Sequence, residues 1–324
     1  MKKQLLKIGW LLSVLFLFTS CVKDDVAYLV VKLEDTESFY SRYEVSHLGS
    51  WCLCEDKQLS EYVSNGDYRS NIEKIIFPSN YVKSKLLKGE SFGCLTPKNV
   101  SIPSSVTKIR ADAFLGCFNL ESIEIPSGVT VIGDYAFQGC KSLTSIEIPS
   151  SVAEIGDGAF EGCSSLTYMS VEEGNLNYDS RGNCNAIIET ISNTLISGCK
   201  STTIPSSVTE IGYCAFDGCE SLTSIEIPSG VTKIETSAFS CCKSLTSIEI
   251  PSSVTEIGSS VFSYCESLKS IEIPSDVTKI EDDAFQGCKS LTSIEIPSSV
   301  TKIGNHAFEG CSSLTSIEIP SGVT

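Results

Sequence analysis

Apolar residues recur along this chain with a period of 23 residues from Ile102 onward. Each unit follows the pattern IPxxVxxIxxxAFxxCxxLxxIx, and eight complete copies occur with no insertion or deletion inside any of them. A fixed period of this length is typical of repeat proteins, whose units bury their apolar residues only by stacking on one another. The copies start at Ile102, Ile125, Ile148, Ile204, Ile227, Ile250, Ile273 and Ile296, and a partial copy starts at Ile319.

Each unit boundary contains the pattern of a short strand. Strand alternation directs Ile146 and Ile148 toward a core and Glu147 outward. Pro149 cannot donate to a strand ladder, so it ends this strand and turns the chain. We therefore expect parallel strands from successive units to form one face of the molecule.

The rest of each unit supplies further core residues. Val152 and Ile155 begin a second short extended piece, and Ala159, Phe160 and Cys163 are expected to point inward on the return arc. In a stack, each of these positions lies about 4.8 Å from its copy in the next unit. The pattern therefore predicts columns of identical side chains along a continuous core.

The spacing L-x-x-I-x-I together with AF-x-GC resembles the BspA-type leucine-rich repeats of bacterial surface proteins, over about three-quarters of the chain. The resemblance implies a mainly β fold: a right-handed solenoid of 23-residue coils with a parallel sheet on one face. It also implies cell-surface attachment, including binding to host matrix proteins. We predict that the solenoid covers 77–324, with a weaker first copy near Phe77, and that a tether and small N-terminal cap occupy 21–76.

The first 20 residues have the order of a secretory signal. Lysines precede an apolar run of 11 residues at 8–18, which is too short to span a bilayer. The small residues before Cys21 resemble the lipobox of bacterial lipoproteins, which implies cleavage before Cys21 and acylation of that residue. A plain secretory signal followed by an unrelated cysteine is the alternative.

The residues after Cys21 bear on location. Lys23, Asp24 and Asp25 resemble the export signal of Bacteroidetes lipoproteins, which implies a lipid-anchored protein on the exterior of the outer membrane. The alternative is a solvated acidic tether with no sorting role. In either case, membrane contact is expected through the lipid anchor only.

Residues 171–203 break the period, and we interpret them as one enlarged coil. Two β-rich runs separated by 190–192 predict a hairpin that projects from the return side. Its role is either that of a tolerated insertion, which we favour, or that of a binding protrusion. Cys184 and Cys199 are placed so that they could pair across this hairpin.

Composition excludes several classes of function. The chain has 324 residues with 24 Lys+Arg and 40 Asp+Glu, a formal net charge of -16, which disfavours nucleic-acid binding. Its two histidines, His47 and His306, are far apart in sequence, and the sequence has no G-x-S-x-G, Walker or H-E-x-x-H motif. We therefore expect neither an enzyme nor a resident cofactor.

Eight of the 16 cysteines occupy one repeat position. Stacking would keep their Cβ atoms about 4.8 Å apart with parallel directions, beyond the roughly 3.5–4.5 Å of disulfides. We interpret these cysteines as small buried hydrophobes. Cys52 and Cys54 form a C-x-C pair, which is a weak metal signal by itself.

Charged positions follow two different rules. At the seventh and seventeenth repeat positions the later units alternate Glu and Lys, so stacked neighbours attract. The twenty-third position instead carries Glu in successive units, beside serine and, in one earlier unit, Tyr168. The resulting candidate ligand face comprises Glu226, Glu249, Glu272, Glu295, Glu318, Ser224, Ser247, Ser293 and Tyr168.

This glutamate column has two possible interpretations. It is either a recognition stripe for a basic protein surface or for divalent cations such as calcium, or a by-product of repeat duplication with little cost in salt. We expect a surface lipoprotein that binds macromolecules, adhesin-like, with proteins favoured over glycans. A glycan-binding lipoprotein for nutrient capture is the alternative, but sugar sites usually need aromatic platforms and Tyr168 is the main one here.

The last unit stops at Thr324, six residues after it begins. A solenoid usually ends in a polar capping unit. We therefore expect either further sequence beyond this end or a partner that covers the last coil.

Overall fold

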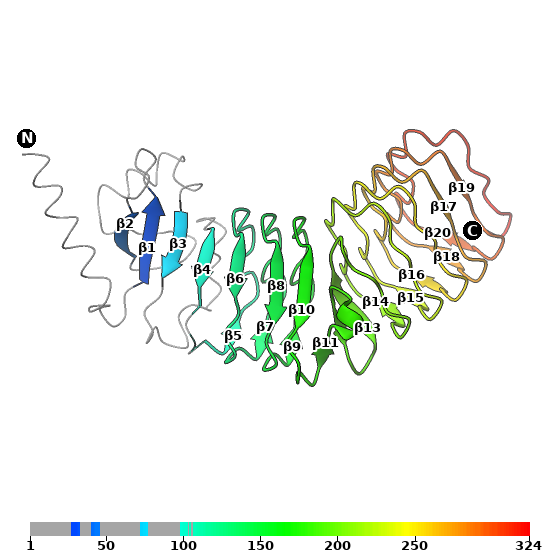
Figure 1. Ribbon diagram of the computed structural model, residues 1–324. Helices are drawn as coiled ribbons and strands as arrows, with labels where there is room; N and C mark the ends of the chain where they lie inside the picture. Colours follow the sequence, from blue (N-terminus) through cyan, green and yellow to red (C-terminus); the bar gives the residue numbers. More distant parts are fainter. Residues whose placement is uncertain (1–26, 33–39, 46–71, 77–97, 103, 105) are drawn as a thin grey trace, which may run out of the picture.

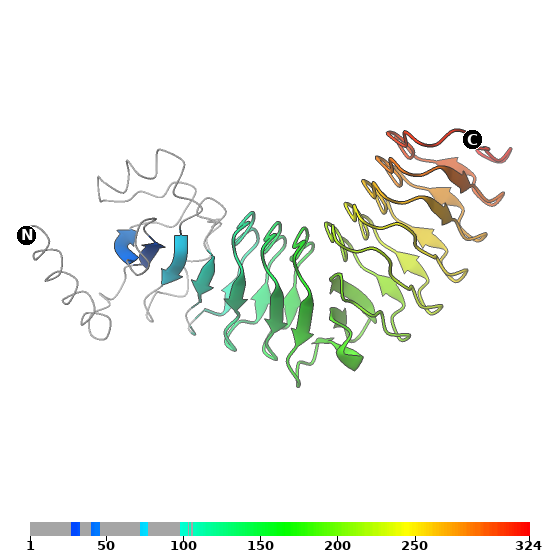
Figure 2. The same ribbon diagram turned by 45° about the horizontal axis from the view of Figure 1, so that its top comes forward.

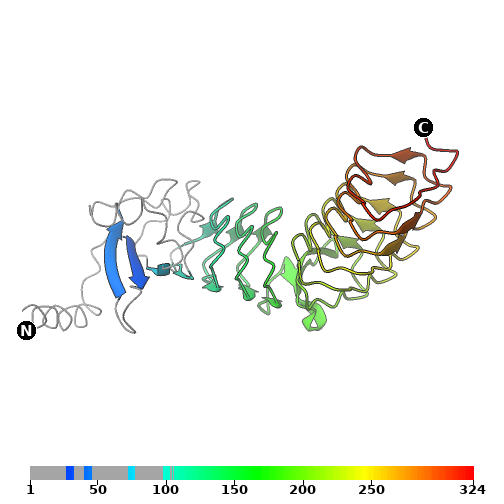
Figure 3. The same cartoon turned by 90° about the horizontal axis from the view of Figure 1, so that it is seen from above.

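The computed structural model describes residues 27–32, 40–45, 72–76, 98–102, 104 and 106–324. Its coils stack into a parallel-strand solenoid, and the described residues contain no α-helix (Figure 1). The 23-residue repeat therefore forms the leucine-rich repeat solenoid that the sequence predicts. Seen from above, successive coils follow one another along the axis of the molecule (Figure 3).

The first face of the solenoid is formed by the strands at the unit boundaries. Ile146 and Ile148 are buried and Glu147 is exposed, as strand alternation predicts. The strands of this face are β4 (Asn99–Ser101), β6 (Ser122–Glu124), β8 (Ser145–Ile148), β10 (Tyr168–Val171), β17 (Ser270–Glu272) and β19 (Ser293–Glu295). β4 pairs in parallel with β6, β8 with β10 and β17 with β19, and beyond the enlarged coil Glu226 and Glu249 form a single bridge.

A second face is built by two-residue strands around the eighth repeat position. Each pairs in parallel with its copies, so Ile211 lies beside Ile234 and Ile234 beside Ile257. These strands are β5 (Lys108–Ile109), β7 (Val131–Ile132), β9 (Glu154–Ile155), β14 (Glu210–Ile211), β15 (Lys233–Ile234), β16 (Glu256–Ile257), β18 (Lys279–Ile280) and β20 (Lys302–Ile303).

Three strands precede the repeats and extend the first sheet. They are β1 (Ala27–Lys32), β2 (Tyr40–Val45) and β3 (Ile72–Ile76). β1 pairs antiparallel with β2 and β3, and β3 pairs in parallel with β4, which gives the order β2-β1-β3-β4-β6. Most of the weaker first copy lies outside the described residues, so the domain boundaries stay a prediction.

Phenylalanine and cysteine columns fill the return side of the core. Phe262 is fully buried and stacks on Phe239 and Phe285, with 5.7 Å between ring centroids in both pairs. Beside this column, the thiol of Cys265 donates to the carbonyl of Phe239 in the preceding coil, at 3.2 Å. Cysteine at this position therefore combines a small apolar volume with a weak donor for a buried carbonyl.

The enlarged coil is part of the stack. It contains β11 (Tyr178–Asp179), a 3-10 turn at Arg181–Asn183, β12 (Ala186–Glu189) and β13 (Thr194–Gly198). β12 and β13 form the predicted antiparallel hairpin, and β13 continues in parallel to β14. The prediction that the hairpin projects was wrong, because most residues of β12 and β13 are buried in the core.

The pairing that was open to Cys184 and Cys199 across the hairpin is not formed. Both thiols are free, and each lies near a different carbonyl, that of Ala186 for Cys184 and that of Asn185 for Cys199. Their side chains belong to two separate apolar clusters, on opposite sides of the hairpin. Burial raises the pKa of both thiols, which favours the protonated form.

The enlarged coil divides the solenoid into two arrays. The apolar core splits into one cluster for the coils before it and another for the coils after it. The phenylalanine column breaks between Phe160 and Phe216, because Gly198 lies in the intervening place and a Cβ there would meet the Phe216 ring at 2.3 Å. Figure 2 shows the two rows of coils meeting at an angle at this joint.

Candidate binding face

The outward row of glutamates on the first face is exposed and continuous in the second array. Glu226 pairs with Glu249, and Glu272 pairs with Glu295, so their side chains stand in register. None of the five glutamates of this column forms an ion pair with a described residue. The like charges therefore face solvent without relief from neighbouring cations. We call this row the glutamate column: Glu226, Glu249, Glu272, Glu295 and Glu318.

The alternating charges elsewhere do pair. Lys243 Nζ lies 2.9 Å from Glu220 of the preceding coil, and Lys289 lies 3.1 Å from Glu266. The hydrogen bond to Glu220 raises the pKa of Lys243. Lys233 on the second face likewise contacts Glu210 and Glu235. Glu210, Glu220 and Glu266 thus each have a lysine partner, whereas the carboxylates of the glutamate column have none among the described residues.

Serine and tyrosine complete the outward rows. Ser224, Ser247 and Ser293 are exposed beside the glutamate column, as predicted. Tyr168, with 53% of its surface exposed, lies in the first array and pairs with Ser145 across β10 and β8. It therefore stands on the far side of the joint from the glutamate column, near Glu147. The residues of the predicted ligand face therefore lie on two separate surfaces, one in each array.

The part of the chain that the structure describes contains no cluster of potential metal ligands. No group of three or more His, Cys, Asp or Glu side chains there could hold an ion. The glutamates stand in single file at strand spacing, so each has at most two carboxylate neighbours. Calcium binding along the column stays a prediction for a melting experiment.

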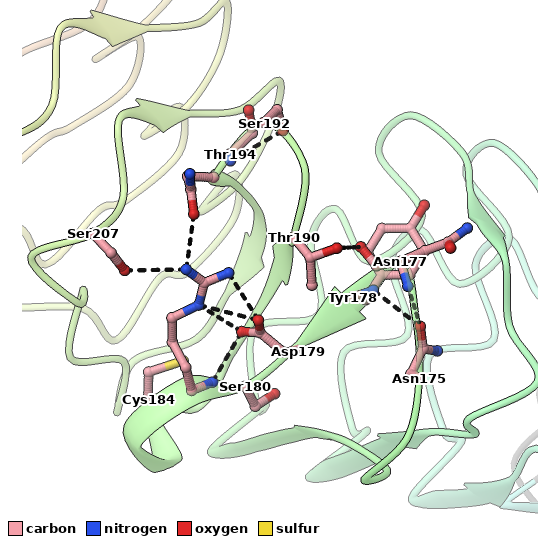
Figure 4. Close-up of polar contacts among 12 residues, drawn as sticks. Asn175, Asn177, Tyr178, Asp179, Ser180, Cys184, Thr190, Ser192, Thr194 and Ser207 are labelled. Carbon is pink, nitrogen blue, oxygen red and sulfur yellow. Dashed lines mark hydrogen bonds and ion pairs between the residues drawn. The ribbon is translucent and has the colours of Figure 1, made fainter.

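The enlarged coil is tied to the coils on both sides. On one side, Asn175 Nδ2 donates to the carbonyls of Pro149 and Val152, and its Oδ1 accepts from the amide of Tyr178. On the other side, Arg181 holds the Asp179 carboxylate at 2.8 Å and donates to Ser207 at 3.2 Å (Figure 4).

The tip of the enlarged coil differs from its base. Leu176 and Ile191 are 86% and 89% exposed, and Thr190, next to Ile191, donates to the carbonyl of Leu176 at 3.1 Å. The buried base and bonded sides favour the interpretation as an accommodated insertion. Of the hairpin that was predicted to project, only the tip at 190–192 lies at the surface.

The anchor and export residues lie outside the described part of the chain. This applies to Cys21, Lys23, Asp24 and Asp25 and to the C-x-C cysteines, Cys52 and Cys54. Among the described residues, no helix is both long enough and apolar enough to cross a membrane. The lipid anchor and the sorting signal therefore stay predictions.

Comparison with known families decides the class of the repeat. The BspA type leucine rich repeat region matches residues 86–195 and 189–315, with six copies. These stretches cover more than half of the chain. The chain belongs to this family. Members of such repeat families present a stacked scaffold, and the shared pattern is one of core residues rather than of catalytic groups.

One solved structure supports the same assignment, and a second is similar in part. A leucine rich cell surface protein from Faecalibacterium prausnitzii is 39% identical, with a TM-score of 0.63 over 70% of this chain and 61% of that chain. The chain thus spans less than two-thirds of that relative. A leucine-rich repeat protein from Eubacterium ventriosum is 26% identical, with a TM-score of 0.49 over 70% of this chain and 80% of that one. No curated protein matches the sequence.

Sequence reasoning missed two groups of residues. Glu172, the second residue of the enlarged coil, stands where the other units carry proline, and its carboxylate accepts from the amide of Ser150 at 2.8 Å. Asp217 lies at the joint beside Glu161, where burial and that carboxylate raise the pKa of Asp217 to about 7. Departure from the repeat consensus was the available signal at Glu172, whereas nothing in the pattern distinguishes Asp217.

Proposed function

We propose that this chain is a cell-surface binding protein whose solenoid attaches to proteins, without chemistry of its own. The glutamate column carries the proposal. A row of exposed, unpaired like charges destabilises the fold, and it offers a regular, rigid array of acceptors at strand spacing. Basic surfaces on a partner protein would relieve the repulsion on binding, which gives electrostatic complementarity.

Surface location is supported by the relative from Faecalibacterium prausnitzii, which is described as a cell surface protein. We propose the same location here, with Cys21 as the acylated residue and Lys23, Asp24 and Asp25 as the export signal. Incorporation of labelled palmitate into the parent protein and its loss in Cys21→Ala would test the anchor. Protease digestion of intact cells tests exposure, since a protected chain means that it does not face the exterior.

A side-by-side binding experiment tests the function. The parent protein is presented to a panel of purified matrix and bacterial surface proteins and to a glycan array. We expect binding to a basic protein, lost at least tenfold when all five glutamates of the column become Gln. Lys233→Gln and Lys279→Gln on the second face serve as controls and should retain it. Binding to glycans alone would establish the alternative, a glycan-capturing lipoprotein.

A further inference from the structure

A hollow of about 500 Å³ lies on the first face of the first array, apart from the glutamate column. Glu124 and Glu147 of the outward row form part of its lining, together with Ser145 and Pro149. Tyr168 and Glu172 complete the wall nearest the enlarged coil. The hollow is therefore formed where the regular repeat meets the irregular one.

Two departures from the repeat explain this hollow. The outward position occupied by Tyr168 is serine in the two preceding coils, at Ser122 and Ser145, so a bulky ring stands beside a shallow row. On the other side, Glu172 replaces the proline of the repeat pattern. Its carboxylate accepts from the amide of Ser150 at 2.8 Å, and this bond lowers the pKa of Glu172.

The lining carries three carboxylates, from Glu124, Glu147 and Glu172, and no lysine, arginine or histidine. None of the three is paired with a cation among the described residues. The exposed ring of Tyr168 adds an electron-rich face, which attracts ammonium and guanidinium groups through a cation–π interaction. Charge and ring together thus favour an organic cation.

A further feature lies on the neighbouring strand β10, at a residue that does not line the hollow. Ser170 lies in the same outward row as Glu147, which it pairs with across β10 and β8. Its hydroxyl oxygen is shielded from solvent and has no hydrogen-bond partner among the described residues. A buried hydroxyl without a partner is costly, and this cost lies directly across the strand pair from Glu147 of the hollow.

The geometry disfavours a metal ion as the occupant. Calcium and magnesium require several carboxylate oxygens around one point, and no such group exists in the described part of the chain. A guanidinium or ammonium group instead tolerates carboxylates spread along a wall and stacks on an aromatic ring. The open hollow accordingly suits the end of a side chain from a partner.

We propose that this hollow binds the charged end of a Lys or Arg side chain presented by a partner protein. The proposal rests on the proposed function, because it assigns a basic protein segment to a second part of the same face. Arginine should bind better than lysine, since its planar group can stack on Tyr168 while donating to Glu147 or Glu172.

A peptide series tests the proposal on the full chain. Three 19F-labelled peptides that differ only at one central residue, Arg, Lys or citrulline, are titrated and observed by NMR. We expect the 19F signals of the Arg and Lys peptides to shift on titration, and the shift of the Arg peptide to need more protein when the Tyr168→Ser variant is used. The citrulline peptide has nearly the same shape without the charge and should bind at least fivefold more weakly. Equal binding of citrulline and Arg peptides overturns the proposal.

Variants locate the binding. Tyr168→Ser installs the residue of the neighbouring coils, so it should fold, and it should weaken the Arg peptide about two- to fivefold. Glu147→Gln and Glu172→Gln should each weaken it at least threefold. Asp276→Asn removes an exposed carboxylate in the second array and should leave it unchanged. If Asp276→Asn weakens binding as much as Glu147→Gln and Glu172→Gln do, general charge attraction explains it and the hollow is not the site.

The two proposals fail separately. If the hollow variants bind the Arg peptide as the parent does while the parent still captures a basic protein, the hollow is wrong and the proposed function stands. If the parent captures no protein of the panel, the proposed function is wrong. In that case the peptide titration still decides whether the hollow takes a basic side chain.

Discussion

The hydroxyl of Tyr135 lies 3.2 Å from that of Tyr213, although 78 residues separate them in the sequence. The ring of Tyr135 extends across the coil 148–170, because that coil carries Gly158, with φ +59°, where a Cβ would meet the ring at 2.6 Å. Nearby, the amide of Gly162 donates to the carbonyl of Asp217 at 2.9 Å, so the backbone ladder continues across the joint. These contacts link the two arrays directly on the return side, in addition to the bonds made by the enlarged coil.

The joint should respond to pH through Asp217. Folded Asp217 keeps its proton up to about pH 7, because burial and Glu161 raise its pKa, whereas the unfolded group releases it near 3.8. The folded state thus binds more protons between these values, and stability falls as pH rises from about 4 to about 7. Asp217→Asn should raise the melting temperature by a few degrees at pH 8 and by less at pH 5.

Calorimetry across this pH range on the parent, Asp217→Asn and Asp276→Asn checks the expectation. The control lies far from the joint in the sequence and should follow the parent at every pH. A pH dependence that is the same in all three proteins would mean that Asp217 does not titrate between pH 4 and 7. Cys214 Sγ lies 3.9 Å from the Asp217 carboxylate, and burial raises the pKa of that thiol, so it stays neutral across the range.

The coil itself could be predicted from sequence because each of its positions is repeated eight times. The alternation of Ile146, Glu147 and Ile148 determines which side of the strand is buried, and Pro149 ends it. The joint could not be predicted in the same way. Gly198 and Gly158 leave space for the rings of Phe216 and Tyr135. Such contacts between coils occur once each, so the repeat pattern of the sequence does not reveal them.

Removal of one core ring should have a local effect. Phe262→Ala deletes a fully buried ring between Phe239 and Phe285 and should cost about 3–5 kcal/mol. Since coupling in a solenoid is mainly between neighbours, amide protection should be lost first around 250–295. Hydrogen exchange measures this coil by coil.

A matched variant in the other array sharpens that test. Phe137→Ala removes the ring between Phe114 and Phe160, and it should loosen coils near 102–170 while those beyond the joint keep their protection. Equal loss along the whole chain in either variant would show that the two arrays unfold as one unit. The split of the core into two clusters argues against such behaviour.

The cysteine column should be inert in the folded protein. Burial raises the pKa of Cys265 well above its ordinary value and that of Cys288 to about 12, so little thiolate forms at neutral pH. Alkylation followed by mass spectrometry should modify these two thiols only after unfolding. Cys241, which is partly exposed, should react first among the described cysteines. A disulfide between any two adjacent members of the column would contradict the buried-thiol interpretation.

The candidate site was predictable only in its repeated half. The glutamate column follows directly from the twenty-third repeat position, and its outward direction follows from strand alternation. The hollow depends instead on two residues that differ from the repeat pattern, Tyr168 and Glu172. Only the stacked structure shows that both line the same hollow. A sequence pattern shows that such residues are exceptional without showing that they share one wall.

Neutralising the glutamate column should stabilise the protein. Adjacent like charges in register repel, and no described cation pairs with them, so replacing all five by Gln is expected to raise the melting temperature by a few degrees. Screening should shrink the difference between 0.01 M and 0.5 M salt. Glu220→Gln is the control, because that carboxylate pairs with Lys243 at 2.9 Å and its loss should bring no gain.

Calcium separates screening from binding along the same column. Calcium favours several carboxylate oxygens, so at millimolar concentration it should raise the melting temperature of the parent more than sodium does at equal ionic strength. The five-Gln variant should lose this extra response, while Glu220→Gln should keep it. If calcium and sodium act equally on the parent, the column responds only to screening. Relief of its repulsion would then have to come from a basic partner, whose binding the same five-Gln variant should abolish.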